Sequence, residues 1–358
     1  MIVPAGEKPD FMSETHEEQR TGHIRSTRVL RYREHGEPGE VLALEEEAVP
    51  EPDADEVLLR TLAAPVNPAD LGQIAGRYAV LKQFPAGAGI EGLGEVSIAG
   101  REVAGVRAGD WVRLPSEPGT WREYVVAKGA GLLRVPNDLP VRQAAMAFVN
   151  PPTARRLLGD FVSLRPGEWL VQNAATSAVG RYVIQLARRY GWRTFNVVRD
   201  EAGGAAVRKA GGDVVVVEGS DLRVAFREAA GEVRPRLGLN SVGGESALGV
   251  LRLLAPGGVL VTFGGMTSEP VRFPTRQLIF DDLSLRGFWL TRWLREAPAV
   301  KIGAMYRDLF DLIRDGTLRV PVAGVYPLEG FREALAHAAR PGRGGKILFV
   351  PAGRPGPR

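Results

Sequence analysis

From residue 28 to about residue 135, the hydrophobic positions come in short runs that Gly and Pro interrupt. Strand-like runs in this part are RVLRYRE, EVLLRTLAAPV, GLGEVSIAG, DWVRLP, WREYVVA and GLLRVP. Short runs of β-forming residues between turn residues are typical of β-strands. The pattern therefore predicts a compact, mostly β domain with few helices.

From Trp169 onward, apolar strands alternate with amphipathic helices. The strand-like runs are WLVQNA, TFNVVR, DVVVVE, LGLNSVG, GVLVTFGG and LSLRGFWL, and helical segments such as VGRYVIQLARRYG and ESALGVLRLLA separate them. This alternation is typical of βαβ units, which build a parallel, doubly wound sheet. The sequence thus predicts an α/β fold, with a Rossmann sheet beside the mostly β domain.

The last part of the chain contains both kinds of pattern. A helical stretch, VKIGAMYRDLFDLIRDG, is followed by β-type VYPL, a helix around FREALAHAA and a final strand, GGKILFVP. We expect this part to pack back on the first domain, so that residues 27–151 and 293–350 form one domain and residues 152–292 the other. Residues 1–26 are predicted to be a mobile extension and residues 351–358 a disordered tail, because chain ends are often poorly ordered.

Length and composition argue against several classes of function. The 358 residues are 44% hydrophobic, which is enough for two buried cores. The 46 Lys and Arg residues barely exceed the 42 Asp and Glu residues and form no basic run with aromatics, so no nucleic-acid partner is expected. No apolar run approaches the roughly 20 residues that cross a bilayer, so no membrane partner is expected either. The first 26 residues contain acidic side chains, unlike a secretory signal or an acid-poor transit peptide, which predicts a cytoplasmic protein.

The residues that usually bind metals are scarce. The chain has no cysteine, and its four histidines, at positions 16, 23, 35 and 337, form no pair with metal-ligand spacing. Disulfides, Cys-based zinc sites and thiol nucleophiles are therefore ruled out together. The sequence predicts no metal site.

A candidate phosphate-binding loop follows the predicted strand WLVQNA. Residues 176–180 read TSAVG and lead into a helix, whose first N–H groups and dipole favour a dinucleotide pyrophosphate. Small side chains let the phosphate approach, and Gly180 lets the helix pack against the strand. The usual G-x-G-x-x-G is absent, because Asn173, Ala175 and Ser177 stand near the glycine positions. An ordinary strand-to-helix turn, capped by its Thr or Ser, is the alternative.

The next strand, TFNVVR, ends at Arg199. NAD-specific proteins usually carry an acidic residue here that binds the ribose hydroxyl, whereas a guanidinium can pair with the 2′-phosphate of NADP. Asp200 and Glu201 follow immediately and weaken this interpretation. A solvated loop arginine is the alternative.

A second motif comes from the first domain. The segment NPADLGQIAGRYAVLKQFPAGAGIEGLGEV resembles the start of the substrate cleft in medium-chain dehydrogenases/reductases. The zinc alcohol dehydrogenases of that superfamily carry G-H-E-x-x-G, in which the His binds catalytic zinc. Residues 89–94 read GIEGLG, and the isoleucine at position 90 cannot bind zinc. This resemblance therefore agrees with the absence of cysteine.

Within the zinc-free branch, the chain resembles the mitochondrial-type trans-2-enoyl-thioester reductases. The resemblance is carried by VNPPTARRLL, LVQNAATSAVGRYVIQLA, FNVVRD, LNSVGG, TFGGM and LRGFWL, and extends from about residue 28 to the last strand. It implies a GroES-like catalytic domain beside the Rossmann domain, NADPH as cofactor, and an acyl thioester substrate on CoA or acyl carrier protein. It also implies a homodimer in which the nucleotide-domain sheets pair edge to edge.

The resemblance also implies roles for individual residues. It assigns catalysis to Tyr78 and Trp289. It assigns cofactor binding to Asn150, Ser177, Ala178, Val179, Gly180, Arg199, Phe263, Gly264, Gly265, Met266, Phe288, Leu290 and Lys346. One departure concerns the 2′-phosphate site, where a second basic residue of the family falls on Glu201.

Several of these residues also fit plainer roles. Phe288 and Trp289, in an apolar strand, are equally consistent with core positions. Gly264 and Gly265 can simply end a strand, although glycine there also lets a flat ring approach the backbone. Lys346 would lie on the surface if the family's residue corresponded to a position one residue away in this sequence.

Reduction of a 2-enoyl thioester needs hydride at the β-carbon, a donor for the enolate oxygen and a proton at the α-carbon. Without zinc, hydrogen-bond donors must polarise the thioester. The phenol of Tyr78 keeps its proton at neutral pH and is the candidate donor, with a packing or surface tyrosine as the alternative.

Two other functions remain open. A quinone reductase of the same branch would share the fold and the cofactor, although NPPTA and FWL favour the enoyl reductase. A non-catalytic NADPH-binding protein is the third possibility.

Overall fold

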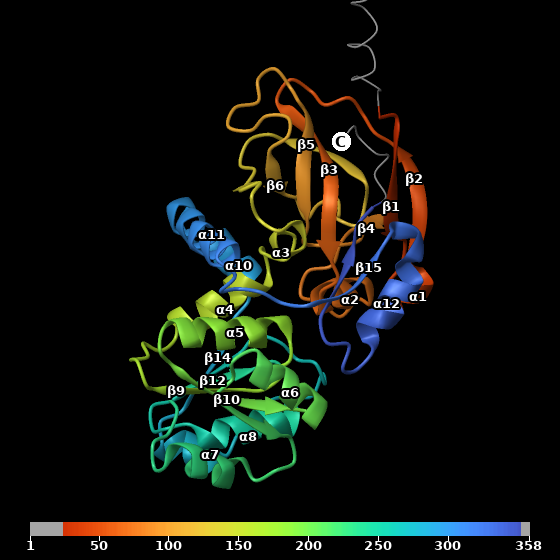
Figure 1. The fold of residues 1–358 in the computed structure, drawn as a ribbon. Helices are drawn as coiled ribbons and strands as arrows, with labels where there is room; N and C mark the ends of the chain where they lie inside the picture. Colours follow the sequence, from red (N-terminus) through yellow and green to blue (C-terminus); the bar gives the residue numbers. More distant parts are fainter. Residues whose placement is uncertain (1–23, 352–358) are drawn as a thin grey trace, which may run out of the picture.

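The computed structural model describes residues 24–351, which form two bodies that meet along one side (Figure 1). A β-rich body contains the N-terminal third of the chain and its C-terminal end, and a parallel-sheet body contains the middle. The predicted mobile extension and disordered tail lie outside the described residues, except for residues 24–26 and 351. Ser26 already begins the first strand, so the extension is predicted slightly too long.

The β-rich body contains most of the strands predicted before residue 136. Its strands are β1 (Ser26–Tyr32), β2 (Ala43–Ala48), β3 (Glu56–Pro65), β4 (Ala86–Gly87), β5 (Leu93–Ala99), β6 (Trp111–Arg113), β7 (Tyr124–Lys128) and β8 (Arg134–Val135). Within the described residues, one sheet has the order β2-β1-β4, and β3, β5, β6 and β8 neighbour one another in a second sheet, with β7 also paired to β3. The short helices are α1 (Pro38–Val41), α2 (Pro68–Ile74) and α3 (Val141–Ala144).

The C-terminal end of the described chain completes this second sheet. Its elements are β15 (Val322–Tyr326), the short 3-10 helix η2 (Leu328–Gly330), α12 (Phe331–Ala339) and β16 (Lys346–Phe349). Strand β16 lies between β15 and β3 and runs antiparallel to β3, with Leu348 opposite Pro65. The sheet therefore joins segments from both ends of the chain.

The parallel-sheet body confirms the predicted Rossmann architecture. Its strands are β9 (Trp169–Gln172), β10 (Arg193–Val198), β11 (Val214–Val217), β12 (Leu237–Asn240), β13 (Val259–Thr262) and β14 (Ser284–Gly287). They pair in parallel in the order β11-β10-β9-β12-β13-β14. The helices are α5 (Ala178–Arg189), α6 (Glu201–Lys209), α7 (Leu222–Ala230), α8 (Gly244–Leu253) and α9 (Thr275–Phe280). The strand order reverses between β9 and β12, and doubly wound folds bind their ligands at such a switch point.

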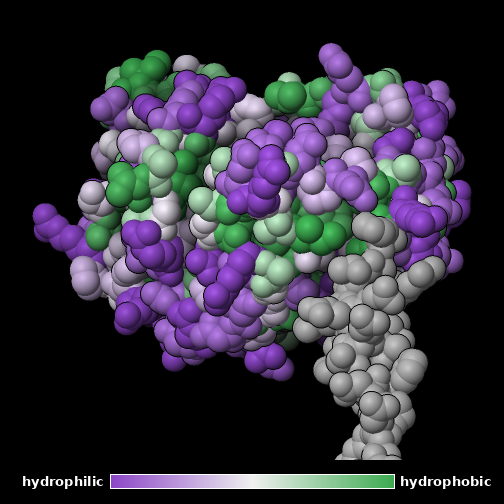
Figure 2. All heavy atoms as spheres, turned by 90° about the horizontal axis from the view of Figure 1, so that it is seen from above, coloured by the Kyte–Doolittle hydropathy of each residue, from purple (hydrophilic) through white to green (hydrophobic). Residues whose placement is uncertain are grey.

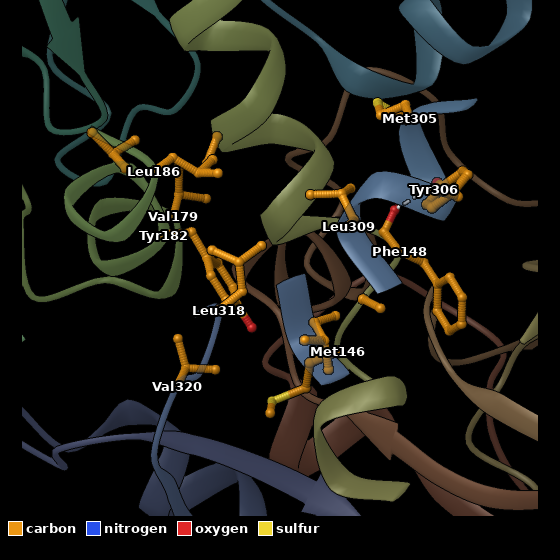
Figure 3. Close-up of a cluster of buried hydrophobic side chains, with 14 of the residues drawn as sticks. Met146, Phe148, Val179, Tyr182, Leu186, Met305, Tyr306, Leu309, Leu318 and Val320 are labelled. Atoms are coloured by element: carbon orange, nitrogen blue, oxygen red, sulfur yellow. Dashed lines mark hydrogen bonds between the residues drawn. The ribbon is translucent and has the colours of Figure 1, made fainter. Parts of the chain in front are cut away.

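One hydrophobic cluster spans the junction of the two bodies. Helices α4 (Asn150–Gly159) and α11 (Ala299–Arg314) lie there, with the shorter α10 (Leu290–Glu296) beside them (Figure 1). Figure 3 shows side chains of α5 and α11 converging with Met146, Phe148, Leu318 and Val320. The cluster also includes Leu93 of β5 and buried residues of β9, β12 and β13. Close packing in this shared core fixes how the two bodies face each other.

The structure differs from the strand prediction at two places. The run LSLRGFWL was predicted as a strand to Leu290, but β14 ends at Gly287, and Leu290 already begins α10. A strand and a helix that share one apolar run cannot be separated by hydrophobicity alone. Strand β2 was not predicted because its sequence, ALEEEA, is mostly acidic. It is nevertheless held beside β1, where Arg31 forms an ion pair with Glu47.

The face of the molecule seen in Figure 2 carries mostly hydrophilic side chains, with separate apolar patches between them. Helices long and apolar enough to cross a bilayer are absent from residues 24–351.

Candidate active site

The predicted phosphate loop lies at the carboxyl end of the central strand β9. Helix α5 begins directly after Ser177, whose Oγ accepts a hydrogen bond from the N–H of Gly180 at 3.0 Å. A Cβ at position 180 would come within 2.7 Å of the carbonyl oxygen of Ala175, so the helix can pack this close only with glycine. Sequence reasoning missed Arg181, which is buried near the start of α5 and donates through Nε to the carbonyl of Thr176 at 3.1 Å. The loop thus combines a capped helix start with a nearby guanidinium.

Asn173, where glycine is absent from the usual motif, ties two strands at the switch point. Its Nδ2 donates to Oδ1 of Asn240, the last residue of β12, at 2.8 Å, and its Oδ1 accepts the N–H of Ser241 at 2.8 Å. The segments around Gly264 and Ser241 lie close together here, because a Cβ at Gly264 would be 2.5 Å from Oγ of Ser241. Gly264, two residues after the end of β13, therefore has a packing role, since its missing side chain makes room for the loop after β12.

Arg199 directly follows β10 and is exposed to solvent. Its two acidic neighbours have other partners. Asp200 caps α6 by accepting the N–H of Gly203 at 2.7 Å, and Glu201 forms an ion pair with Arg208 at 3.2 Å. Neither acidic residue is therefore paired with Arg199.

Tyr78 and Trp289 meet across the space between the two bodies. Nε1 of Trp289 donates to the hydroxyl oxygen of Tyr78 at 3.0 Å, and the rings lie edge to face with centroids 6.3 Å apart. An indole N–H can only donate, so the hydroxyl proton of Tyr78 is not used in this contact. Burial raises the pKa of Tyr78 above its ordinary value of 10.0. The pair thus presents a protonated phenol that can donate a hydrogen bond.

The loop after Tyr78 is anchored by Lys82, which is buried. Its ammonium donates to the carbonyls of Gly87 and Ser116, each at 3.0 Å, and forms an ion pair with Glu117 at 3.3 Å. A cavity of about 360 Å³ lies beside this loop. Because the lysine already has these partners, it serves to hold the loop.

Asn150 and Lys346 meet in a buried polar cluster around Asn67. Nζ of Lys346 donates to Oδ1 of Asn67 and to the carbonyl of Val66, each at 2.6 Å. Nδ2 of Asn150 donates to the same Oδ1 of Asn67 at 3.1 Å. Lys346 is only 5% exposed, so the alternative of a surface lysine is wrong, and burial lowers its pKa to about 8.

Two buried carboxylates complete this cluster, and sequence reasoning gave neither of them a role. Oε1 of Glu91 accepts the N–H groups of Phe148 and Val149 at 2.8 and 2.7 Å. Asp70 accepts the N–H groups of Asn67 and Ile90 at 2.7 and 2.8 Å. Burial raises the pKa of both carboxyls, that of Asp70 to about 7. The signal for Glu91 was its place in the run GIEGLG, just before an apolar strand.

The remaining predicted residues divide between core and surface. Phe263 and Phe288 pack against the shared hydrophobic cluster, and Phe288 meets Phe161 edge to face at 6.1 Å. The packing of Phe288 is therefore consistent with a core position, whereas Trp289 has the polar partner described above. Leu290 is buried, and Gly265 and Met266 are exposed after β13. Within residues 24–351, no group of three or more His, Cys, Asp or Glu side chains could hold a metal ion.

Comparisons with known proteins agree with this geometry. Residues 53–137 match the family model of the alcohol dehydrogenase GroES-like domain, and residues 178–304 match that of zinc-binding dehydrogenases. A mitochondrial enoyl-[acyl-carrier-protein] reductase from Xenopus tropicalis is 44% identical over 338 residues, which cover 91% of this chain and 95% of the relative.

Two solved structures show the same fold. One is the complex of Etr1p with NADP and crotonyl-CoA, with a TM-score of 0.83, 29% identity, and coverage of 91% of this chain and 100% of the other. The second is described as a putative NADPH:quinone reductase from Bacillus thuringiensis, with a TM-score of 0.84, 25% identity, and coverage of 91% and 99%.

The comparisons contradict the predicted cytoplasmic location. The relatives from Xenopus tropicalis, Bos taurus and Homo sapiens are all named as mitochondrial enzymes. The prediction rested on acidic residues among the first 26, and the composition of a terminal segment does not report where the folded protein works.

Proposed function

Because the chain belongs to the medium-chain dehydrogenase/reductase family, among its enoyl-[acyl-carrier-protein] reductases, we propose that it reduces the C2–C3 double bond of a 2-enoyl thioester with NADPH. The observation that carries this proposal is the contact of Tyr78 with Trp289. It joins the two bodies and leaves the phenol proton free to donate.

The residues present fit NADPH, which when bound supplies the hydride for the β-carbon. The N–H groups of Ala178 and Val179 at the start of α5 would bind the pyrophosphate, as in other helix-terminal phosphate sites, while the N–H of Gly180 is bound by Ser177. Arg199 would bind the 2′-phosphate, because a guanidinium pairs strongly with phosphate. Asn150 and Lys346 would contact the cofactor from the β-rich body, with residues 263–266 on the opposite side.

Tyr78 carries the chemistry that falls to the protein. Negative charge develops on the thioester oxygen as hydride arrives, and a donor aimed at this oxygen lowers the barrier. The raised pKa keeps the phenol protonated at neutral pH, so Tyr78 can donate to the enolate oxygen or pass a proton toward the α-carbon. Trp289 supports this role by donating to the oxygen of Tyr78, which leaves the phenol proton to the substrate.

An exposed sheet edge supports a homodimer. Strand β14 is the last in its sheet, and its four residues are exposed. The preceding helix α9 exposes Ile279 and Phe280 to 65% and 76%. An edge strand flanked by exposed apolar side chains is suited to pairing with a second copy. A single monomeric species in analytical ultracentrifugation would contradict this arrangement.

The test of function is a substrate panel with NADPH oxidation followed optically. We expect turnover of crotonyl-CoA or a crotonyl acyl carrier protein at rates far above those with a quinone. Preferred turnover of the quinone would support the second candidate, which the similarity to the Bacillus thuringiensis structure favours. NADPH binding without turnover of either substrate class would indicate a non-catalytic protein. The ratio of the two crotonyl substrates would identify the carrier.

A further inference from the structure

Asn67 is the centre of the buried cluster, although neither the sequence motifs nor the reaction assigns it a role. It is 2% exposed and directly precedes α2. Its Oδ1 accepts from Lys346 at 2.6 Å and from Asn150 at 3.1 Å, and its Nδ2 donates to Oε2 of Glu91 at 2.8 Å. One amide thus connects segments that precede α2, begin β16, begin α4 and precede β5.

The orientation of this amide follows from what its neighbours can offer. Lys346 can only donate, so an oxygen of Asn67 must face it. An ionised Glu91 can only accept, so the NH₂ group must face the carboxylate. The other oxygen of Glu91 is bound by the N–H groups of Phe148 and Val149, just before Asn150. Glu91 therefore fixes both the amide of Asn67 and the start of α4.

We propose that Asn67 and Glu91 are positioning residues that orient Lys346 and Asn150 toward the cofactor. This inference rests on the proposed function, because it assumes that these two side chains contact NADPH. Described acceptors engage two of the three ammonium protons of Lys346, and no described carboxylate lies at salt-bridge distance from it. The third proton is thus left for a ligand. Glu91, Asp70 and Arg343 are the charged groups that act on this ammonium electrostatically.

Two single substitutions test whether the donor and acceptor pattern matters. Asn67→Asp keeps an oxygen toward Lys346 but turns a second oxygen toward Glu91, where a shared proton would be needed. In Glu91→Gln, the new NH₂ group must face another hydrogen-bond donor, either the NH₂ group of Asn67 or the N–H groups at the start of α4. Each change should raise the NADPH dissociation constant about tenfold or more, because a hydrogen bond to a charged group is lost or reversed.

The double substitution Asn67→Asp with Glu91→Gln is the decisive experiment. The new carboxylate at position 67 would accept from Lys346 and Asn150. The new amide at position 91 would donate to that carboxylate, while its oxygen would accept the N–H groups before α4. The pattern is then complementary again, with the same total charge. We expect the double variant to bind NADPH within about threefold of the wild type, and a double-mutant cycle to show strong coupling.

Folding is followed separately by thermal unfolding. Asn137→Ser, at an exposed asparagine whose Oδ1 accepts the N–H of Trp111 at 3.1 Å, is the matched control and should leave NADPH binding unchanged. If a single variant fails to fold, Asn67→Ser replaces it, because serine also suits a position before a helix while withdrawing the amide from Lys346. This variant should also bind NADPH about tenfold more weakly.

The outcomes separate the inference from the proposed function. A wild-type protein that does not bind NADPH overturns the function. A wild type that binds, with folded Asn67 variants that bind equally well, overturns the positioning role. A double variant no better than the worse single variant overturns the proposed complementarity.

Discussion

The cofactor half of the proposed site follows two consecutive strands, with Ser177 and Gly180 after β9 and Arg199 after β10. The substrate half brings Tyr78 to Trp289 across 211 residues of sequence. Two kinds of group would hold the cofactor: Arg199 is exposed and accessible to a charged ligand, whereas Asn67, Glu91 and Lys346 belong to a buried hydrogen-bonded cluster. A pyrophosphate can be bound by backbone N–H groups, but an enolate needs a donor at one defined place. The half that performs the chemistry thus depends on a contact between two residues that lie far apart in the sequence.

This difference predicts that the two halves fail in different ways. Loss of a group in the substrate half should lower the rate and spare cofactor binding. Loss of a group in the cofactor half should do the reverse. Each substitution below either sharpens this division or breaks it.

The largest effect is expected for Tyr78→Phe. The hydrogen bond of Tyr78 strengthens as charge develops, so its removal should lower kcat by roughly 10²–10³ while NADPH affinity stays near normal. The ring and its packing against Trp289 remain. Stopped-flow and steady-state assays with an enoyl thioester measure the effect, with Tyr190→Phe, at a half-buried tyrosine beside Trp192, as the control. A wild-type kcat in Tyr78→Phe would show that another donor serves the oxygen.

Arg199→Ala should give the next largest effect, in binding alone. Loss of one charge-assisted contact to the 2′-phosphate corresponds to about 1.5–3 kcal/mol, or roughly 10- to 150-fold in the NADPH dissociation constant. The dissociation constant for NADH and kcat at saturating NADPH should change little. Fluorescence titration with both cofactors measures this, and Arg223→Ala, at an exposed arginine on α7, is the control. Equal losses for NADPH and NADH would remove Arg199 from the 2′-phosphate site.

The same division explains what could be predicted from the sequence. The Rossmann sheet was predictable because each of its strands and helices shows its own hydrophobic pattern within a short stretch of sequence. The phosphate loop was predictable because it directly follows the strand β9. The roles of Asn67 and Glu91 were not predictable, because they depend on Lys346 from the other end of the chain. Sequence resemblance pointed to Tyr78 and Trp289 separately, but no local pattern indicates that an indole N–H would bind the phenol oxygen. The run LSLRGFWL misled for a related reason, since only packing decides that Trp289 leaves the sheet.

A smaller effect is expected for Trp289→Phe. The ring persists but the N–H donor to Tyr78 is lost, and a single hydrogen bond contributes about 0.5–1.5 kcal/mol. The resulting loss in kcat should therefore be about 2- to 12-fold, well below that of Tyr78→Phe. Combining both substitutions should add little, because the indole acts through the phenol. A full additive loss in the double variant would mean that Trp289 contacts the substrate independently. Trp192→Phe, at a tryptophan whose ring packs on Tyr190, is the control.

The smallest effect, none at all, is expected for prolonged chelation. The position of the zinc-binding histidine in related alcohol dehydrogenases is Ile90 here, and the adjacent Glu91 is already committed to Asn67 and two backbone N–H groups. No cysteine exists in the chain, so thiolate ligands are also missing. Dialysis against a chelator should therefore leave kcat and NADPH affinity unchanged, and elemental analysis should find no stoichiometric zinc. Activity lost to the chelator and restored by zinc would contradict this assignment, because the buried cluster around Glu91 would then be a metal site. Glu91→Gln under the same treatment separates the cases, since a metal ligand would change zinc content whereas a positioning residue would change only cofactor affinity.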